Sequence, residues 1–265
     1  MPSPPRLPRS FRSKVKIKLK KGKALEAMRE AGRLAAEVLR VCREAVAPGV
    51  TTGDIDELCL KTTRALGAES STLGFCGFPG SLCVSVNEEV IHGIPGKRVI
   101  NLGDIVSLDV TVNYGGYHGD NAVTVAVGDI PDSTAELIRV TRDALAAGIA
   151  AARPGAHLSD VSAAVQAVAR EGGCGVVREF VGHGIGREMH EEPQVPNFGR
   201  AGRGPVLEEG MVFCIEPMFT RGSPAIRVLD DGWTVVTRDG QPAAHFEHTV
   251  AIGPDGAEIL TPRGS

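Results

Sequence analysis

The sequence predicts an α+β protein built from two similar halves. In each half, one expected helix ends at a Pro-Gly pair and another starts five residues after that glycine, at Asp54 and Asp160. These two starts are 106 residues apart. A pattern of a glycine, an apolar run and a carboxylate occurs twice, and its carboxylates, Asp109 and Glu216, are 107 residues apart. A His-Gly-Ile triplet also occurs twice, with its histidines 91 residues apart. Matches in the same order indicate an internal repeat whose loops differ in length.

The composition is that of an ordinary globular protein, because 42% of the 265 residues are hydrophobic and 23% are charged. No apolar run approaches membrane-spanning length, and the start lacks the hydrophobic segment of a signal peptide. Six cysteines form no Cys-x-x-Cys pair, which argues against zinc knuckles and a disulfide framework. We therefore expect a cytoplasmic protein with reduced thiols and no membrane contact.

The N-terminus differs from the rest in charge. Residues 1 to 23 hold nine basic and no acidic side chains, whereas the remainder has a net charge of −12. Prolines in residues 1 to 13 favour a flexible arm. Such an arm suits contact with ribosomal RNA, although a solvated tail is the commoner outcome. From Lys14 to Lys20, lysines alternate with apolar residues, which predicts an edge strand.

The first half, about residues 24 to 130, is expected to open with two helices. Apolar residues recur at spacings of three and four from Leu25 to Val46, which predicts an amphipathic helix that stops at Pro48-Gly49. A second helix is expected from about Asp54 to Leu66. Glycines, aromatic residues and short β-branched runs then follow.

The first half closes with a predicted hairpin. Gly103 to Val112 reads as a buried strand with Asp109 in its middle, and Gly115-Gly116 forms the turn. Asp120 stands at the head of the returning β-rich run, where it fits a turn aspartate as well as a ligand. Burying an isolated ionised carboxylate is costly, so Asp109 indicates a partner charge or a metal.

The second half, about residues 131 to 253, repeats this plan. Ser133 and Glu136 match a capping box that would start a helix. Later, Glu216 follows an apolar run and Glu247 lies inside another. Both are therefore expected on strands, as Asp109 is.

The segment from Gly182 to Pro193 is the most distinctive in the chain. It holds His183 between glycines and His190 before an acidic turn. The glycines lack the spacing of a dinucleotide fingerprint, and they disfavour the helix of a His-Glu-x-x-His zinc protease. Taken alone, the segment fits a functional loop or a glycine-rich turn with surface histidines.

Together these positions predict a metal centre. Four carboxylates, two from each half, are expected to converge: Asp109, Asp120, Glu216 and Glu247. Like charges this close stay ionised only with cations between them. With His183 added, the set suits two divalent ions ~3.5 to 4 Å apart, chosen from Mn, Fe, Co and Zn, that lower the pKa of a bridging water. His92 and His190 are available to stabilise a developing oxyanion.

The combined motifs resemble type I methionine aminopeptidases. They span about Lys16 to Leu260 and comprise Asn87 to Pro95, Asp109-Val110-Thr111, Gly119-Asp120, Gly182 to Pro193, Ile215 to Met218 and Glu247-His248-Thr249. The resemblance implies the pita-bread (creatinase/aminopeptidase) fold, with two pseudo-symmetric halves and an antiparallel sheet flanked by helices. It also implies one catalytic domain over residues 14 to 265, a monomer, and removal of the initiator methionine from nascent polypeptides when the second residue is small.

The resemblance also assigns roles to residues. The two divalent ions would be held by Asp109, Asp120, His183, Glu216 and Glu247. Asp120 and Glu247 would bridge them, and Glu216 would also relay a proton. His92 and His190 would contact the substrate and steady the tetrahedral intermediate. The methionine side chain would be surrounded by Phe75, Phe78, Cys83, Met189 and Trp233.

Two departures and two rival interpretations accompany this assignment. The family often has Tyr-His-Gly-Tyr-Pro where this chain has Phe75 to Pro79, and commonly an aromatic residue at Met189. One rival is a proline-directed peptidase of the same fold, but those proteins generally carry a large extra N-terminal domain. The other is a non-catalytic pita-bread binding protein, which typically lacks some ligands that this chain retains.

Overall fold

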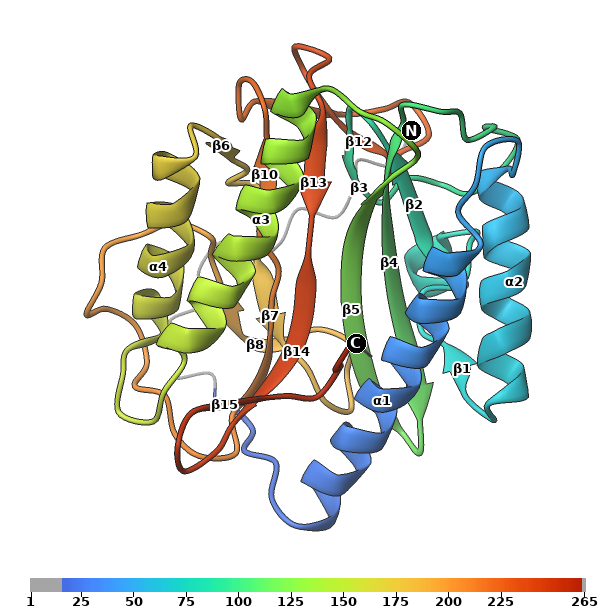
Figure 1. Ribbon diagram of the computed structural model, residues 1–265. Coiled ribbons are helices and arrows are strands. Elements are labelled where there is room, and N and C mark those ends of the chain that lie inside the picture. The colour runs from blue at the N-terminus through green and yellow to red at the C-terminus, as the bar shows by residue number, and fades with distance from the viewer. Residues whose placement is uncertain (1–15, 264–265) are drawn as a thin grey trace.

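A nine-stranded antiparallel sheet runs through the centre of the protein in the computed structural model, which describes residues 16 to 263 (Figure 1). Its main path, in order of pairing, is β1 (Glu69–Ser70), β4 (Ile105–Tyr114), β5 (Tyr117–Ala126), β14 (Glu247–Ile252), β9 (Val212–Ile215), β7 (Gly182–Gly184) and β8 (Glu191–Val195). Two strands lie off this path: β2 (Cys83–Val86) pairs with β4, and β15 (Ala257–Ile259) pairs with β14. Segments far apart in the chain thus meet in one sheet.

Two three-stranded sheets accompany the main one. The first contains β13 (Ala243–His245), β10 (Met218–Thr220) and β6 (Gly175–Val176). The second contains β11 (Ile226–Val228), β12 (Val235–Thr237) and β3 (Glu89–Ile91). Because β3 comes from the first half of the chain and β11 and β12 from the second, this small sheet ties the halves together.

Four helices cover the sheet in two pairs (Figure 1). They are α1 (Lys23–Glu44), α2 (Thr52–Ala65), α3 (Asp132–Ala151) and α4 (Leu158–Glu171). The apolar face of α1, including Leu34, Val38 and Leu39, is buried in one core with the apolar face of β4. None of the helices within residues 16 to 263 combines the length and apolar character that a membrane span requires. The predicted α+β class, with helices flanking an antiparallel sheet, is confirmed.

The strand registers separate a long hairpin from a short junction. β4 and β5 pair along ten positions, from Ile105 opposite Ala126 to Tyr114 opposite Tyr117. By contrast, β5 and β14 pair at only two positions. Glu247 lies opposite Ala122, and His248 lies opposite Asn121. The sheet is therefore continuous across the two halves of the chain, and the ladder at that crossing is short. The bounds of the halves, about 24 to 130 and 131 to 253, stay a prediction.

Helix starts differ in detail from the prediction. Asp54 and Asp160 are the third residues of α2 and α4, and each carboxylate accepts the N–H of the residue before the helix at 2.8 Å. The capping box predicted from Ser133 and Glu136 is wrong. Pro131 precedes α3 with its φ fixed near the helical value, so Ser133 already lies inside the helix and Glu136 pairs with Arg139 instead.

The predicted edge strand is also wrong for its described part. Residues 16 to 20 form no strand; the Lys20 N–H donates to the Gly210 carbonyl at 2.7 Å. Burial reverses the alternation at the end of this segment, because Leu19 is 40% exposed and Lys20 only 4%. An ion pair of Lys20 decides which side chain turns inward. The basic arm, residues 1 to 13, lies outside the described residues.

Candidate active site

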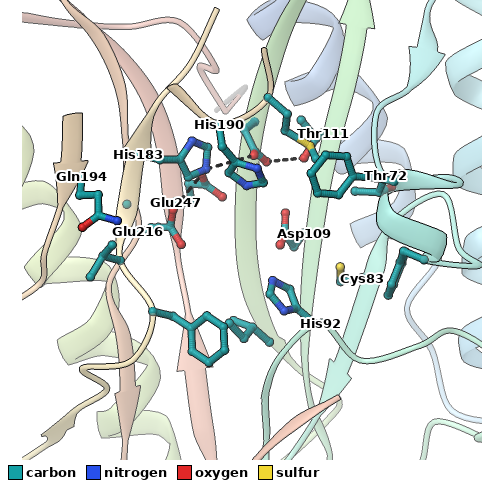
Figure 2. Close-up of a pocket in the computed structure, with 18 of the residues that line it drawn as sticks. Thr72, Cys83, His92, Asp109, Thr111, His183, His190, Gln194, Glu216 and Glu247 are labelled. Atoms are coloured by element: carbon teal, nitrogen blue, oxygen red, sulfur yellow. Dashed lines mark hydrogen bonds and ion pairs between the residues drawn. The ribbon is translucent and has the colours of Figure 1, made fainter. Parts of the chain in front are cut away.

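One deep cavity of about 540 Å³ brings the predicted site residues together (Figure 2). Its walls come from strands of both halves and from the loops between them. Every residue that the sequence nominated lines it: Phe75, Phe78, Cys83, His92, Asp109, Asp120, His183, Met189, His190, Glu216, Trp233 and Glu247. Thr111 and Phe180, which were not nominated, line it too.

The two-residue period of β4 explains how Asp109 reaches the cavity. Val106, Leu108 and Val110 are fully buried in the core that also holds the inner face of α1. Asp109 and Thr111 point the opposite way and line the cavity. The Thr111 hydroxyl donates to Asp120 Oδ1 at 2.8 Å across the hairpin. One face of β4 therefore packs in the core, and its other face lines the cavity.

Asp120 lies within β5 rather than in a turn, so the turn alternative is excluded. Its residue is 5% exposed, and burial raises the pKa of its carboxyl to about 6. Its N–H donates to the Thr249 hydroxyl at 3.1 Å, and that hydroxyl donates to the Asp120 carbonyl at 2.8 Å. These bonds fix Asp120 against β14, where Glu247 lies.

The second half supplies two glutamates. Glu247 opens β14, is 2% exposed, and its Oε1 has no hydrogen-bond partner among residues 16 to 263. Glu216 directly follows β9 and is not inside a strand, in contrast to the prediction. Its carbonyl accepts from the Asn197 amide at 2.9 Å. Behind Glu247, the Arg263 guanidinium donates to the main-chain carbonyls of Glu247 and Ala122.

His183 points its unprotonated nitrogen at these acids. Nδ1 lies 3.0 Å from the Gly184 carbonyl and must donate, because a carbonyl only accepts. In the neutral ring Nε2 is therefore a free lone pair. It faces Glu216 Oε1 at 3.5 Å and Asp120 Oδ2 at 3.8 Å. Burial lowers the pKa of His183 to about 3, so the ring is neutral near pH 7.

The chemistry of this group fits a cation. Burial raises the pKa of the Asp109, Glu216 and Glu247 carboxyls well above the usual range. Among the described residues that line the cavity there is no lysine or arginine to neutralise them. A lone pair of His183 facing carboxylate oxygens, together with the orphaned Glu247 Oε1, satisfies the donor requirements of a divalent ion.

Cys214 also lies at this cluster, which the sequence did not predict. Its Sγ and ligand atoms of Asp120, His183 and Glu247 all lie within 4.8 Å of one another. The thiol is buried, and its Sγ lies 3.5 Å from the Thr249 hydroxyl. Because that hydroxyl donates its proton to the Asp120 carbonyl, the thiol is the donor of this hydrogen bond. Cys214 stands two residues before Glu216 on the same face of the β9 region, and this spacing is the signal that could have revealed it.

The opposite end of the cavity is aromatic. The Trp233 ring lies 5.1 Å from Phe78 and 6.3 Å from His92 between centroids. Phe180 meets His92 edge to face at 5.5 Å. The backbone of His92 has a φ of 58°, in the left-handed region. This conformation is energetically unfavourable for residues other than glycine. Burial lowers its pKa to about 4, so His92 is neutral near pH 7 and keeps one N–H to donate.

The mouth of the cavity carries His190. Its ring centroid is 4.4 Å from His183 and 5.5 Å from Phe75, which is 39% exposed. Met189 beside it is 8% exposed and closes the wall. Figure 2 shows His183, His190, Glu216, Glu247, Asp109 and His92 arranged around one space. Acidic residues, imidazoles and an apolar end thus share a single cavity.

Sequence relatives agree with this arrangement. A match to metallopeptidase family M24 covers residues 26–254, most of the chain. The chain belongs to metallopeptidase family M24. A methionine aminopeptidase from Clostridium perfringens is 49% identical over 245 residues, which is 92% of this chain and 98% of the relative. Methionine aminopeptidase 1 from Bacillus subtilis is 47% identical over 88% of this chain and 94% of its own.

Solved M24 structures agree in fold. The crystal structure of methionine aminopeptidase from Thermotoga maritima matches with a TM-score of 0.91 at 46% identity, covering 93% of this chain and 99% of that one. The prolidase from Pyrococcus furiosus matches with a TM-score of 0.75 at 22% identity, which shows a shared fold alone. This chain covers 66% of that prolidase. The predicted pita-bread fold is confirmed for this M24 protein.

Proposed function

We propose that this M24 metallopeptidase is a methionine aminopeptidase that removes the initiator methionine from nascent polypeptides when the second residue is small. The observation that supports the proposal is a cavity whose acidic end fits a cation and whose other end is lined by aromatic rings. The aromatic end fits the apolar side chain of an N-terminal residue. The acidic end lies where the peptide bond after that residue would be cut.

We further propose the ligands of the ions. Two divalent ions, of Co, Mn, Fe or Zn, would be held by Asp109, Asp120, His183, Glu216 and Glu247. Bound divalent ions supply a Lewis acid and lower the pKa of a water toward neutrality. The Nδ1 donation of His183 to Gly184 fixes the ring so that Nε2 stays available.

The chain's own side chains complete the reaction. His92, neutral and buried, presents an N–H to oxygen of the substrate, and His190 does so from the mouth. Donors that reach the developing oxyanion stabilise the transition state more than the ground state. Glu216 would move a proton from the attacking water toward the leaving amine, because a carboxylate oxygen that faces the cavity can accept that proton and then donate it.

The aromatic end recognises the methionine side chain. Phe78 and Trp233 meet at the back, with Cys83 on β2 and Met189 on the wall, and Phe75 lies at the rim. Thioether contacts with aromatic rings contribute about 0.3 to 1.5 kcal/mol each beyond area burial. Phenylalanines at positions 75 and 78 keep this apolar surface without hydroxyl groups.

The activity is tested on protein purified without added metal. We expect hydrolysis of Met-Ala-Ser to appear on titration with Co²⁺, Mn²⁺, Fe²⁺ or Zn²⁺, while Ala-Pro and Gly-Pro dipeptides are left intact. Metal content is measured in parallel. Cleavage of the proline dipeptides alone would favour the proline-directed alternative. Bound metal without any peptide hydrolysis would instead indicate a non-catalytic binding protein.

We propose that the protein acts in the cytoplasm as a monomer, with its basic arm contacting the ribosome. Deleting residues 1 to 12 should leave Met-Ala-Ser hydrolysis unchanged and weaken co-sedimentation with ribosomes at low salt, because phosphate contacts are salt-dependent. Deletion that abolishes tripeptide hydrolysis would instead make the arm part of the site. Equal co-sedimentation of both proteins would remove the ribosome proposal.

A further inference from the structure

The loop that carries His190 is fastened by a buried ion pair to the segment before α1. Lys20 Nζ lies 2.8 Å from Glu191 Oε2, and the two side chains are only 5% and 4% exposed. Lysine is rarely buried to this degree unless it is paired. Glu191 directly follows His190 in the chain. The pair therefore joins a position at the mouth of the cavity to a segment 171 residues earlier.

The second oxygen of Glu191 folds the loop onto itself. Oε1 accepts the main-chain N–H of Arg187 at 3.1 Å and that of Glu188 at 3.4 Å. Gly186 lies against the same group, because a β-carbon there would be 2.7 Å from both Glu191 Oε1 and Lys20 Cε. Residues 186 to 191 are thus wrapped around one carboxylate that Lys20 neutralises.

Two further supports hold the ends of this arrangement. The Lys20 N–H donates to the Gly210 carbonyl at 2.7 Å, so its backbone is fixed as well as its side chain. On the other side, the His118 N–H donates to the Gly186 carbonyl at 2.9 Å, and the Arg187 guanidinium lies 4.6 Å from the centre of the Tyr117 ring. The loop is held between the β4–β5 hairpin tip and residues 16 to 20.

His190 depends on this support more than His183 does. Within residues 16 to 263 its ring makes no side-chain hydrogen bond, whereas His183 donates to Gly184. The ring contacts of His190 are with Phe75 and His183, from an exposed position at the mouth. Its placement therefore follows mainly from the backbone on either side of it.

We propose that Lys20 is a positioning residue for His190, acting through Glu191. This inference rests on the proposed function only in that His190 is taken to act on the bound peptide. The basic segment before α1 is then a structural part of the active site, although it lines no part of the cavity. A purely structural role would predict lost stability without a selective loss of turnover.

The kinetic test compares four variants on Met-Ala-Ser. Lys20→Met should lower kcat by about 10-fold to 100-fold with KM within about twofold and metal content unchanged, because misplacement of a catalytic group costs rate. Lys20→Arg should restore most of kcat. Lys18→Met is the matched control, since Lys18 lies 3.6 Å from Glu191 but is 64% exposed, and its kcat should stay within about twofold of wild type. In a His190→Ala background, Lys20→Met should change kcat by less than about twofold.

A second measurement does not depend on turnover. Amide hydrogen exchange of Arg187 and Glu188 should speed up by about 10-fold or more in Lys20→Met, because their acceptor is no longer fixed. If Lys20→Met fails to fold, Lys20→Met with Glu191→Gln removes both charges and keeps an acceptor for the two amides. The double variant should fold and still lose kcat.

Three outcomes decide the proposal. Unchanged kcat together with unchanged exchange in Lys20→Met would overturn it. An equal loss of kcat from Lys20→Met in the wild-type and His190→Ala backgrounds would also overturn it, because the effect would not pass through His190. If wild-type protein hydrolyses no Met peptide, the proposed function fails, and the exchange of the two amides still decides whether Lys20 fastens the loop.

Discussion

The two ends of the cavity are built from different kinds of structure. At the acidic end, Asp109, Asp120 and Glu247 lie on three neighbouring strands. Asp109 and Glu247 both pair with Ala122, which is two residues from Asp120. At the aromatic end, Phe78 follows a short 3-10 helix (Phe75–Gly77) and Trp233 lies in the connection between β11 and β12. The proposed reaction chemistry is thus set on a rigid sheet and the proposed specificity on connecting segments.

This difference predicts which end tolerates change. A carboxylate on a paired strand cannot shift without breaking the hydrogen bonds of the ladder around it. The loss of one carboxylate therefore leaves the neighbouring carboxylates misplaced or without the ion that neutralises them. An aromatic side chain in a connection has neighbours that can repack. Substitutions at the acidic end should therefore affect turnover and ion binding, whereas those at the aromatic end should affect substrate choice.

The largest effect is expected from the acidic end. Glu247→Gln, Asp109→Asn and His183→Ala should each lower kcat/KM by more than about 100-fold and lower metal content, because each removes a proposed ligand. Far-UV circular dichroism should stay at the wild-type signal. Glu44→Gln, on the exposed side of α1, is the control and should be neutral. Normal metal content in Glu247→Gln would remove Glu247 from the ligand set.

The next effect is expected from the two histidines that stand between the ends. His92→Ala and His190→Ala should lower kcat by about 100-fold to 1,000-fold with metal content near normal, because they act on the transition state. Kinetics and metal analysis on the same preparations check this. If either variant lost its metal, that histidine would belong with the ligands and not with the substrate contacts.

A smaller effect is expected from the aromatic end. Trp233→Leu should raise KM for Met-Ala-Ser by about 10-fold, the equivalent of about 1.4 kcal/mol, and leave metal content unchanged. Wild-type protein should prefer Met over Leu modestly and over Lys or Glu strongly, because a charge there would be buried without a partner.

The second-residue filter belongs to the same specificity experiment. A panel of Met-Xaa peptides should be cleaved only when the second residue is Gly, Ala, Ser, Cys, Thr, Pro or Val. Equal cleavage of the Ala and Phe members would refute the filter while leaving the ion chemistry untouched.

The smallest effect is a pH dependence confined to the acidic end. In metal-free protein, burial raises the pKa of Asp120 from 3.8 to about 6, so the folded state binds its proton more tightly than the unfolded state does. That contribution to stability is complete below pH 3.8 and is lost as pH rises through about 6. The melting temperature of chelated protein should therefore fall by roughly 5 °C over this range relative to the metal-loaded protein.

Calorimetry at matched pH values tests this difference. The metal-loaded protein should not show the fall, because the ions compensate the ionised carboxylates. Asp120→Asn should make the fall of the chelated protein smaller. The part due to Asp109, Glu216 and Glu247 should remain, because burial raises the pKa of those carboxyls too. If the melting temperatures of the chelated and metal-loaded forms changed with pH in parallel, the raised pKa of Asp120 would make no measurable contribution to stability.

Much of the fold and the nominated site could be predicted from the sequence, for a physical reason. The apolar period of α1 and the buried run around Asp109 are local patterns that burial enforces. Alternation in β4 would even have assigned Thr111 to the cavity face. Such patterns are readable because the core and the site use opposite faces of one strand.

The errors share a different cause. Lys20 was expected outside and lies inside, because its partner Glu191 is 171 residues away and no local pattern encodes that pairing. Phe180 lines the cavity from the connection between β6 and β7, and Cys214 meets the acidic cluster from β9. Ser133 was assigned to a cap although Pro131 had already fixed the start of the helix.

The short ladder between β5 and β14 makes this protein divisible. The chain crosses from one side of that ladder to the other through exposed Gly128 and Asp129. A chain opened there would give one fragment with Asp109 and Asp120 and another with Glu247. Neither fragment alone would hold all five proposed ligands, so ions bound at the proposed site would join the two fragments. Split in this way, the protein would become a complementation pair whose reassembly depends on metal.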